Sequence, residues 1–134
     1  MGVLIDSDVL INLERRDEEI ASFIRGREEE DVFVSVISAS ELLHGLHRAK
    51  NADIRSRRLA FVEGVLSAFP ILEIDLPAAR CHAQLWSELE KRGHKIGIHD
   101  SWLAATCLAH GLTLVTGNAR EFQRVAGLRV ELWT

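Results

Sequence analysis

Short apolar runs alternate with longer amphipathic stretches along the chain. The apolar runs are typical of buried strands, which we expect at residues 2–5, 32–36, 71–74, 112–115 and 128–132. The intervening stretches have apolar residues at helical spacing, which predicts helices at residues 9–14, 17–29, 38–49, 54–68, 77–92, 100–110 and 118–122. Because strands and helices alternate, we predict one domain over residues 1–134, a Rossmann-like three-layer α/β/α sandwich with a mainly parallel central sheet.

Capping residues indicate where several of these helices begin or end. Ser38 and Glu41 have the spacing of a capping box, so Ser38 is expected to be the N-cap of its helix. Pro77 fits the first turn of the helix that it opens. Gly111 is expected just beyond the end of the last long helix, and Asn118 is expected to cap the short helix after it.

The composition is that of an ordinary globular protein. Of the 134 residues, 47% are hydrophobic and 27% are charged, so the chain can bury one substantial core. The first residues reach Asp6 without the basic segment of a signal peptide, and no apolar run approaches the ~18 residues of a membrane-spanning helix. The two cysteines, Cys81 and Cys107, are too few for a disulfide framework and are expected to be buried. We therefore expect a soluble, cytoplasmic protein.

The net charge weighs against a nucleic-acid binder, whereas the distribution of charge leaves that function open. The formal net charge is −4, and nucleic-acid-binding domains are usually basic. Acidic residues concentrate at residues 17–19 and 28–31. Basic residues gather in one segment, at Arg48, Lys50, Arg55, Arg57 and Arg58. This basic segment is either a surface for a phosphate backbone or a solvated helix face, and the sequence favours neither.

Three carboxylates and one amide follow the predicted strands. Asp6 ends the first strand, Glu41 lies in the first turn of the helix after the second, and Asp100 begins the helix before the fourth. Asn118 comes shortly after the fourth strand. Because ligands in open α/β sheets sit beyond the carboxyl ends of the strands, we expect these side chains to converge. Converging carboxylates repel one another unless a cation neutralises them, which predicts a site for hard divalent cations.

Each acid also has a purely structural explanation. Glu41 fits the capping box, and Asp100 fits a first-turn acid that the helix dipole favours. Asp6 at a strand end fits a cap for the next turn, and Asp8 fits the same role better. The argument for a site therefore rests on the joint pattern. Two cations held by such a cluster can activate a water and stabilise the leaving oxygen of a phosphodiester, which makes a nuclease the leading hypothesis.

The joint pattern resembles the PIN-domain family, in particular the VapC-type toxins of bacterial and archaeal toxin–antitoxin pairs. The resemblance covers essentially the whole chain. It is carried by VLIDSDVLI at residues 3–11, SELLHG at 40–45, IGIHDSWLAA at 96–105, LVTGN at 114–118 with Phe122, and VAGLRV at 125–130. Each motif is weak alone, but their order and spacing are specific.

The resemblance implies a role for each matching residue. It implies three acids that bind Mg²⁺ or Mn²⁺, which are Asp6, Glu41 and Asp100. Asn118 stands where the family often has an aspartate, and an amide is a poorer ligand, so it would orient a water or the substrate phosphate. Ser7 and Thr116 would support the same site from beside the ligands.

The resemblance also implies an activity and partners. The activity is that of an endoribonuclease that uses water to cleave RNA, leaving a 5′-phosphate and a 3′-hydroxyl. The partners are a second copy of the chain and a cognate VapB-like antitoxin that inhibits the enzyme. Gly45 leaves room for a partner or for a packed helix. The apolar stretch 59–69 belongs either to a dimer contact or to the core.

Two alternatives use the same acids differently. Asp6 and Asp8 have the spacing of the nucleophile and general acid of haloacid-dehalogenase-like phosphatases, but Val9 and Leu10 replace the Gly-Thr that follows in that family. A non-catalytic PIN-like binding module is the other alternative. It predicts that Asp6→Asn leaves function intact.

Two further alternatives use other residues. Glu41, His44 and His47 share one helix face and form a conceivable zinc site, although no HExxH motif is present. Asp75 follows the third predicted strand like the phospho-acceptor of a receiver domain, but the lysine expected late in such a chain is absent after Lys95.

Overall fold

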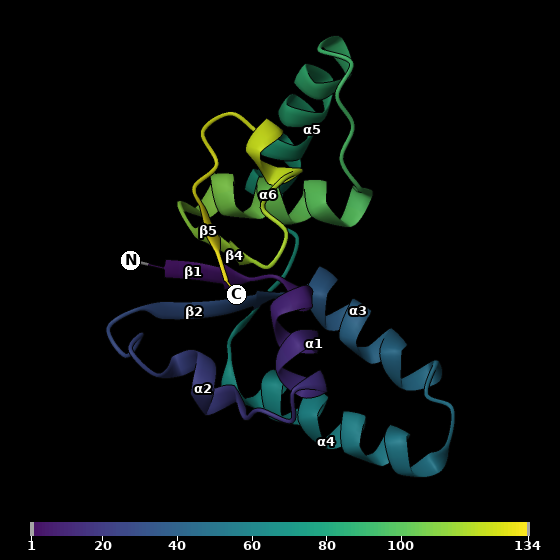
Figure 1. Cartoon of the computed structure of the whole chain (residues 1–134). Helices are drawn as coiled ribbons and strands as arrows, with labels where there is room; N and C mark the ends of the chain where they lie inside the picture. The colour runs from purple at the N-terminus through teal and green to yellow at the C-terminus, as the bar shows by residue number, and fades with distance from the viewer. Residues whose placement is uncertain (1, 134) are drawn as a thin grey trace.

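The computed structural model describes residues 2–133 and arranges them as a parallel sheet between two layers of helices (Figure 1). The strands are β1 (Gly2–Ile5), β2 (Asp31–Ser35), β3 (Ile71–Leu72), β4 (Thr113–Thr116) and β5 (Val130–Leu132). They form a five-stranded sheet of order β3-β2-β1-β4-β5, in which every pairing is parallel. The predicted three-layer sandwich with a mainly parallel sheet is confirmed.

The helices divide between the two faces of the sheet. They are α1 (Ser7–Arg15), α2 (Ile20–Ile24), α3 (Val36–His47), α4 (Ala52–Ala68), α5 (Leu76–Lys91) and α6 (Ile98–His110). Figure 1 shows α5 and α6 on one face and α1 to α4 on the other. None of the helices within residues 2–133 is long and apolar enough to cross a membrane.

Each face of the sheet has its own core because side chains alternate along a strand. Val3 and Ile5 of β1 pack in a cluster with Leu10 of α1 and Val65 of α4. Leu4, between them in sequence, packs in the second cluster with residues of α5 and α6, which include Leu85, Leu89 and Leu103. The strand is therefore buried on both sides, as its continuous apolar sequence predicts.

Two predicted helices are wrong in extent or type. The helix expected over residues 17–29 is the short α2, because Asp17 and Gly26 both adopt left-handed backbone conformations, with φ of 55° and 84°. The helix expected from Asn118 to Phe122 is replaced by a 3-10 turn, η1 (Phe122–Arg124), whose N-cap is Glu121. Asn118 therefore caps no helix.

The capping box expected at Ser38 is also wrong. The N-cap of α3 is Ser35, whose hydroxyl accepts a hydrogen bond from the amide of Ile37 at 3.1 Å. Ser38 lies inside the helix, fully buried, and its hydroxyl has no hydrogen-bond partner within residues 2–133. Ser38 has Glu41 at capping-box spacing and Ser35 has no Glu or Gln there, so the sequence pattern favours the wrong serine. As a consequence, Glu41 lies a turn beyond the cap and its side chain is free to face another element.

The remaining helix ends lie close to their predicted positions. The helix that contains Asp100 begins at Ile98, and Gly111 ends it with φ of 65°, as expected for a C-terminal glycine. In the apolar stretch 59–69 of α4, Val62, Val65 and Phe69 are buried in the core, whereas Leu59 is exposed. Most of that stretch therefore serves core packing.

Candidate active site

The site lies at the carboxyl edge of the sheet, between its central strands. The chain adds β2 and β3 on one side of β1 and β4 and β5 on the other, so the direction of winding reverses between β1 and β4. A crevice forms at such a reversal and is the usual ligand site of an open α/β sheet. Asp6 follows β1 and Thr116 ends β4, which places both residues at this point.

Asp6 is connected to three elements by hydroxyl groups. Its Oδ2 accepts a hydrogen bond of 2.9 Å from Thr116 Oγ1. The Ser7 hydroxyl lies 3.5 Å from Asp6 Oδ1 and 3.2 Å from Glu41 Oε1, so its single proton can serve either carboxylate. Asp6, Ser7 and Thr116 are all buried, at 6%, 4% and 0% exposure. These bonds bring together residues that the sequence separates by more than one hundred positions.

Glu41 extends from α3 toward the same place. Besides the Ser7 hydroxyl, its carboxylate lies 3.7 Å from Nδ1 of His99, which is in the first turn of α6. Because Ser35 caps α3, the capping explanation of Glu41 no longer applies. The side chain instead joins the middle of α3 to the starts of α1 and α6.

Asp100 faces the cluster from the first turn of α6, and a fourth acid accompanies it. Its carboxyl group is close enough to that of Glu121 for the two to share a proton, and the charges of Asp6, Glu121 and Glu41 act on it. A hydrogen bond between two carboxyl groups requires a proton on one of them. Sequence reasoning missed Glu121, because it lies in an irregular loop just before η1, where no periodic pattern marks it.

Burial and mutual repulsion raise the pKa values of the two central aspartates. Burial raises the pKa of Asp6 to about 6, the charges of Asp8 and Glu41 add to the rise, and the Thr116 hydrogen bond partly offsets it. Burial, followed by the charge of Asp6 and the hydrogen bond and charge of Glu121, raises the pKa of Asp100 to about 7. The helix dipole at the start of α6 acts in the opposite direction and is outweighed. Both carboxyl groups thus ionise at a higher pH than ordinary aspartates do, and Asp100 still holds a substantial share of its proton at pH 7.

Asp8 connects α1 to the loop after β4, so the expectation that it caps the turn after β1 is wrong. Its carboxylate accepts hydrogen bonds from the amide of Gly117 at 3.1 and 3.2 Å and from Thr116 Oγ1 at 3.4 Å. A Cβ atom at position 117 would lie 3.2 Å from the Asp8 carboxylate, so glycine there permits the close approach. Thr116 therefore lies between two carboxylates.

Asn118 contributes less than the sequence suggests. Its backbone amide donates a hydrogen bond of 3.1 Å to Thr116 Oγ1, while its side chain is exposed. Glu121, three residues later, is the acid that approaches Asp100. The role of the Asn118 amide toward a water or a phosphate stays a prediction.

The donor set fits a hard divalent cation by its chemistry. All of its groups are oxygen ligands, and the raised pKa values reflect a charge that a cation would compensate. Within residues 2–133, however, no three His, Cys, Asp or Glu side chains are grouped tightly enough for a ready three-ligand site. This spacing suits Mg²⁺, which keeps several waters and binds through one or two carboxylates.

The alternative sites lack support in the described part of the chain. His44 and His47 are exposed, and the imidazole next to Glu41 is that of His99. Asp75 caps α5 by accepting from the amide of Ala78 at 2.9 Å and forms an ion pair with His110 at 2.8 Å. These contacts explain Asp75 without a phospho-acceptor role.

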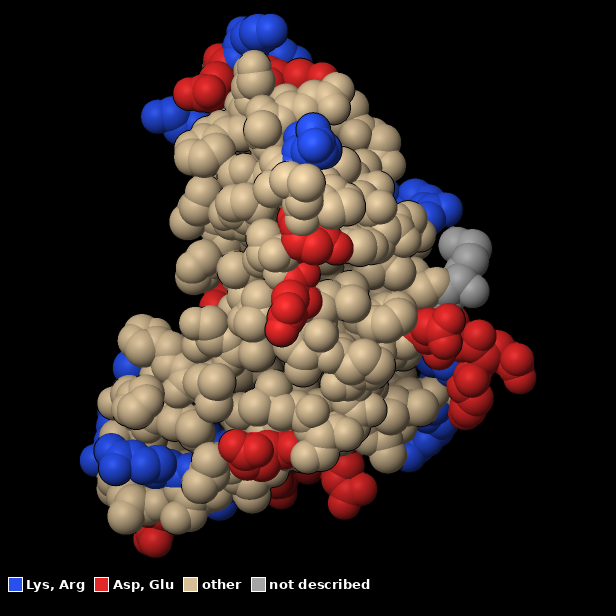
Figure 2. Space-filling view, turned by 180° about the vertical axis from the view of Figure 1, so that it is seen from behind, with Lys and Arg blue, Asp and Glu red and all other residues tan. Residues whose placement is uncertain are grey.

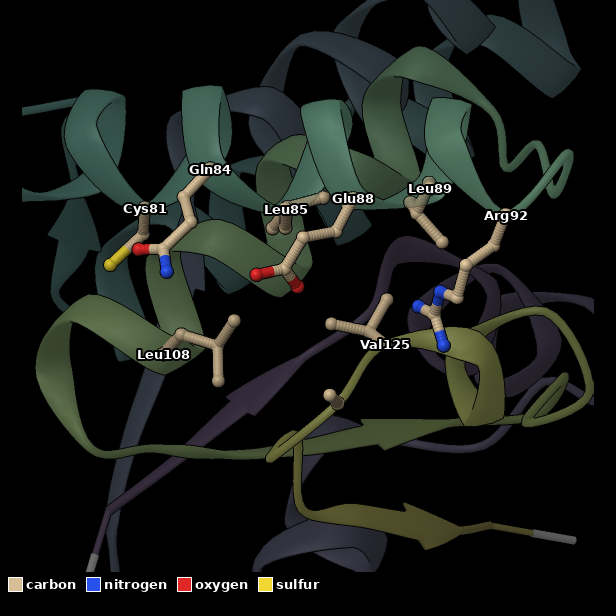
Figure 3. Close-up of a pocket in the computed structure, with 9 residues that line it drawn as sticks. Cys81, Gln84, Leu85, Glu88, Leu89, Arg92, Leu108 and Val125 are labelled. Carbon is tan, nitrogen blue, oxygen red and sulfur yellow. The ribbon is translucent and has the colours of Figure 1, made fainter.

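A hollow between α5, the end of α6 and the loop before β5 lies apart from the carboxylates (Figure 3). Leucine and valine side chains form much of its wall, Glu88 extends toward its middle, and Arg92 lies at one end. None of the acids described above lines it. This hollow is therefore not part of the candidate site.

Comparison with known proteins agrees with this geometry. A sequence model of the PIN domain matches residues 3–128. Ribonuclease VapC1 of Rickettsia felis is 36% identical over 130 residues, which are 97% of this chain and 95% of the relative. The tRNA(fMet)-specific endonuclease VapC of Shigella flexneri is 37% identical over 101 residues, which are 75% of this chain and 74% of the relative.

Solved structures give the same result. A chain in the crystal structure of DNA-bound VapBC from Salmonella typhimurium superposes with a TM-score of 0.89 at 30% identity, covering 100% of this chain and 99% of that one. A chain of VapBC2 from Rickettsia felis, bound to a promoter DNA fragment, has a TM-score of 0.88 at 24% identity with full coverage of both, which supports the fold. The chain therefore belongs to the PIN-domain family, and its relatives within that family are VapC ribonucleases.

Proposed function

We propose that this protein is a metal-dependent endoribonuclease and the toxin of a VapBC-type toxin–antitoxin pair. The observation that carries the proposal is the convergence of Asp6, Glu41 and Asp100 at the reversal point of the sheet, where burial and repulsion raise the pKa of two of them. The names of the curated relatives, which are ribonucleases and a tRNA endonuclease, support the same activity.

Each residue of the site would have a distinct role. Asp6, Asp100 and Glu41 supply the oxygen ligands, and Glu121 adds a carboxyl group beside Asp100. A bound Mg²⁺ or Mn²⁺ would compensate this charge and make a water more acidic. Ser7 and Thr116 hold the carboxylates of Asp6 and Glu41 in fixed orientations, which matters because groups next to metal ligands affect affinity strongly. The partly exposed Asp100 and Glu41 leave the site open to a polymer.

A basic groove beside the site supports a nucleic-acid substrate. It has a volume of about 480 Å³, lies between α1, α3 and α4, and reaches Glu41. Its cationic residues are Arg15, Arg48, Lys50 and Arg58. Figure 2 shows basic side chains at the lower corner where α3 and α4 meet, and acidic ones at the opposite edge, near α2 and β2. Glu14 and Glu41 also line the groove, so four cationic and two acidic side chains leave it with a net positive charge that would attract phosphates.

Partners are proposed from the relatives and from the groove. Solved neighbours from Salmonella typhimurium and Rickettsia felis are VapBC complexes, so we propose a VapB-like antitoxin for this chain. A Cβ atom added to Gly45, in the groove, would meet nothing within 4 Å, which leaves room for a partner there. We also propose a homodimer, and cytoplasmic action on RNA, as the resemblance implies.

A cleavage assay tests the proposed function. The parent protein and the Asp6→Asn and Asp100→Asn variants are incubated with structured RNA in EDTA, Mg²⁺ or Mn²⁺. We expect the parent to cleave only with a cation, and each variant to lose roughly 10²-fold or more, because a lost ligand removes several kcal/mol of transition-state stabilisation. Asp31→Asn is the matched control, since Asp31 is exposed at the start of β2. Equal cleavage by the parent and both site variants would contradict the roles of Asp6 and Asp100, whereas no cleavage by the parent with any cation would favour the non-catalytic binding module.

A further inference from the structure

A second hollow borders the carboxylate cluster and differs in chemistry from the basic groove. It has a volume of about 560 Å³ and lies between α1, the loop after β4 and the residue that follows β5. Asp8 lines it, and the Thr116 hydroxyl that bonds Asp8 also bonds Asp6. Whatever occupies this hollow is therefore next to the candidate active site.

An arginine and a tryptophan form one wall of the hollow. The guanidinium group of Arg16, at the end of α1, lies over the ring of Trp133 at 5.7 Å from its centroid. Trp133 is fixed from behind, because its ring contacts that of Phe23 at 6.5 Å and its amide donates a hydrogen bond of 2.9 Å to the carbonyl of Thr116. A planar cation on a fixed aromatic ring is a surface on which nucleobases stack.

The two ends of the hollow carry opposite charges. Arg15 and Arg16 are exposed at the end of α1, whereas Asp8 lies at the other end, beside Gly117. A phosphate is attracted to the arginines and repelled by Asp8. Ile11 and Arg15 also line the basic groove, so the two hollows adjoin at these residues.

One residue that lines the same wall has a side-chain acceptor without a partner. The side-chain oxygen of Asn12 is buried and has no hydrogen-bond partner within residues 2–133. Asn12 lines the hollow from the face of α1 between Asp8 and Arg16. A buried carbonyl oxygen is ordinarily satisfied, so it points to a donor that arrives with a ligand or with water. Every nucleobase has an N–H group that can serve as this donor.

We infer that this hollow binds one nucleotide of single-stranded RNA next to the bond that is cleaved. The base stacks on the Arg16–Trp133 pair, its N–H edge faces Asn12, and its phosphate lies toward Arg15. The inference rests on the proposed nuclease function, because it supplies the site for a nucleotide that flanks the scissile phosphate.

The test measures RNA binding in EDTA, where cleavage does not interfere. The full chain is titrated with a fluorescein-labelled single-stranded RNA oligonucleotide, and anisotropy gives the dissociation constant. We expect Arg16→Ala to weaken binding about tenfold, since stacking on a side chain contributes substantially per base. Arg25→Ala is the matched control, because Arg25 is exposed at the end of α2 and lies outside the hollow. We expect Arg15→Ala to lower the salt dependence of binding. The slope of the logarithm of the binding constant against the logarithm of the salt concentration should be smaller in magnitude by roughly 0.7.

Tryptophan fluorescence locates the bound base. We expect unlabelled RNA to quench the emission of the parent protein. The Trp133→Phe variant keeps an aromatic ring, so we expect it to bind RNA while losing the quenching. Quenching that persists in Trp133→Phe, or equal affinities for the parent and Arg16→Ala, would overturn the nucleotide site and leave the nuclease proposal intact. Conversely, a parent protein that binds RNA but cleaves none with any cation contradicts the nuclease proposal alone.

Discussion

The hydroxyl of Thr116 donates a hydrogen bond of 2.9 Å to the carboxylate of Asp6 and lies 3.4 Å from that of Asp8. This bond joins the ends of β1 and β4, the two strands between which the winding of the sheet reverses. One buried hydroxyl thus holds the most buried carboxylate of the site and connects it to the hollow beside α1.

Removing that hydroxyl should damage the site more than the fold. In Thr116→Val the Asp6 oxygen loses a partner that lowers its pKa, so the pKa rises further and the carboxylate holds a cation less well. We expect Mn²⁺ affinity and the cleavage rate to fall roughly tenfold or more, as is usual when a group next to a ligand is removed. Thr113→Val on the same strand is the matched control. Cation affinity that is unchanged in Thr116→Val would show that the bond does not orient Asp6.

Much of the fold and part of the site could be predicted from the sequence. The strands are visible because β1 and β4 are short runs of apolar and β-branched residues. The convergence of Asp6, Glu41 and Asp100 follows from the connections at the carboxyl ends of the strands. Glu121 could not be found in this way, because a residue in an irregular loop is placed by tertiary packing. The capping serine of α3 could not be identified, because Ser38 has Glu41 at capping-box spacing whereas Ser35, the actual cap, has no such partner.

Glu121 provides a direct test of the carboxylate that sequence reasoning missed. Glu121→Gln removes a charge next to Asp100 while keeping the size of the side chain and its ability to form hydrogen bonds. We expect this variant to cleave RNA at least several-fold more slowly at saturating Mg²⁺. Asn118→Ala is expected to have a smaller effect, since the Asn118 side chain is exposed. A larger loss in Asn118→Ala than in Glu121→Gln would restore the amide as the fourth site residue.

The raised pKa of Asp100 predicts that its charge destabilises the cation-free protein. The pKa is about 7 in the folded protein and 3.8 in the unfolded chain, so the folded state binds more protons between these values. Stability therefore falls as the pH rises from about 4 to about 7, and the loss is complete above pH 7. We expect Asp100→Asn to melt a few degrees higher than the parent at pH 8 in EDTA, with the difference vanishing near pH 4.

Two further measurements test whether the loss of stability at high pH comes from Asp100 and not from the loss of any surface charge. Asp31→Asn, at the exposed start of β2, should show the same difference in melting temperature between pH 4 and pH 8 as the parent. Added Mg²⁺ should raise the melting temperature of the parent at pH 8 more than that of Asp100→Asn, because the cation binds the ionised carboxylates of the folded state. An Asp100→Asn variant that is less stable than the parent at pH 8 would contradict the assignment of repulsion to this cluster.

His82 of α5, which packs against the helix that carries Asp100, predicts a pH dependence of the opposite sign. Its imidazole is 3% exposed, stacks on Trp102 with ring centroids 3.7 Å apart, and lies 2.9 Å from the Ser101 hydroxyl. That hydroxyl donates to the carbonyl of Ile98, so the imidazole is the donor toward Ser101. Burial lowers the pKa of His82 below its ordinary 6.5. The stabilisation that the neutral His82 imidazole provides is therefore complete above pH 6.5 and is lost as the pH falls below that value.

The His82→Phe variant isolates this contribution. Phenylalanine keeps the ring stacked on Trp102 but has no proton to gain, so only the parent is penalised at low pH. The carboxylate cluster is the same in both proteins and cancels from their difference. We expect His82→Phe to melt lower than the parent at pH 8, because the hydrogen bond to Ser101 is lost, and the gap to narrow as the pH falls to 5. A difference in melting temperature between the two proteins that stays constant from pH 8 to pH 5 would mean that His82 is protonated as easily in the folded protein as in the unfolded chain.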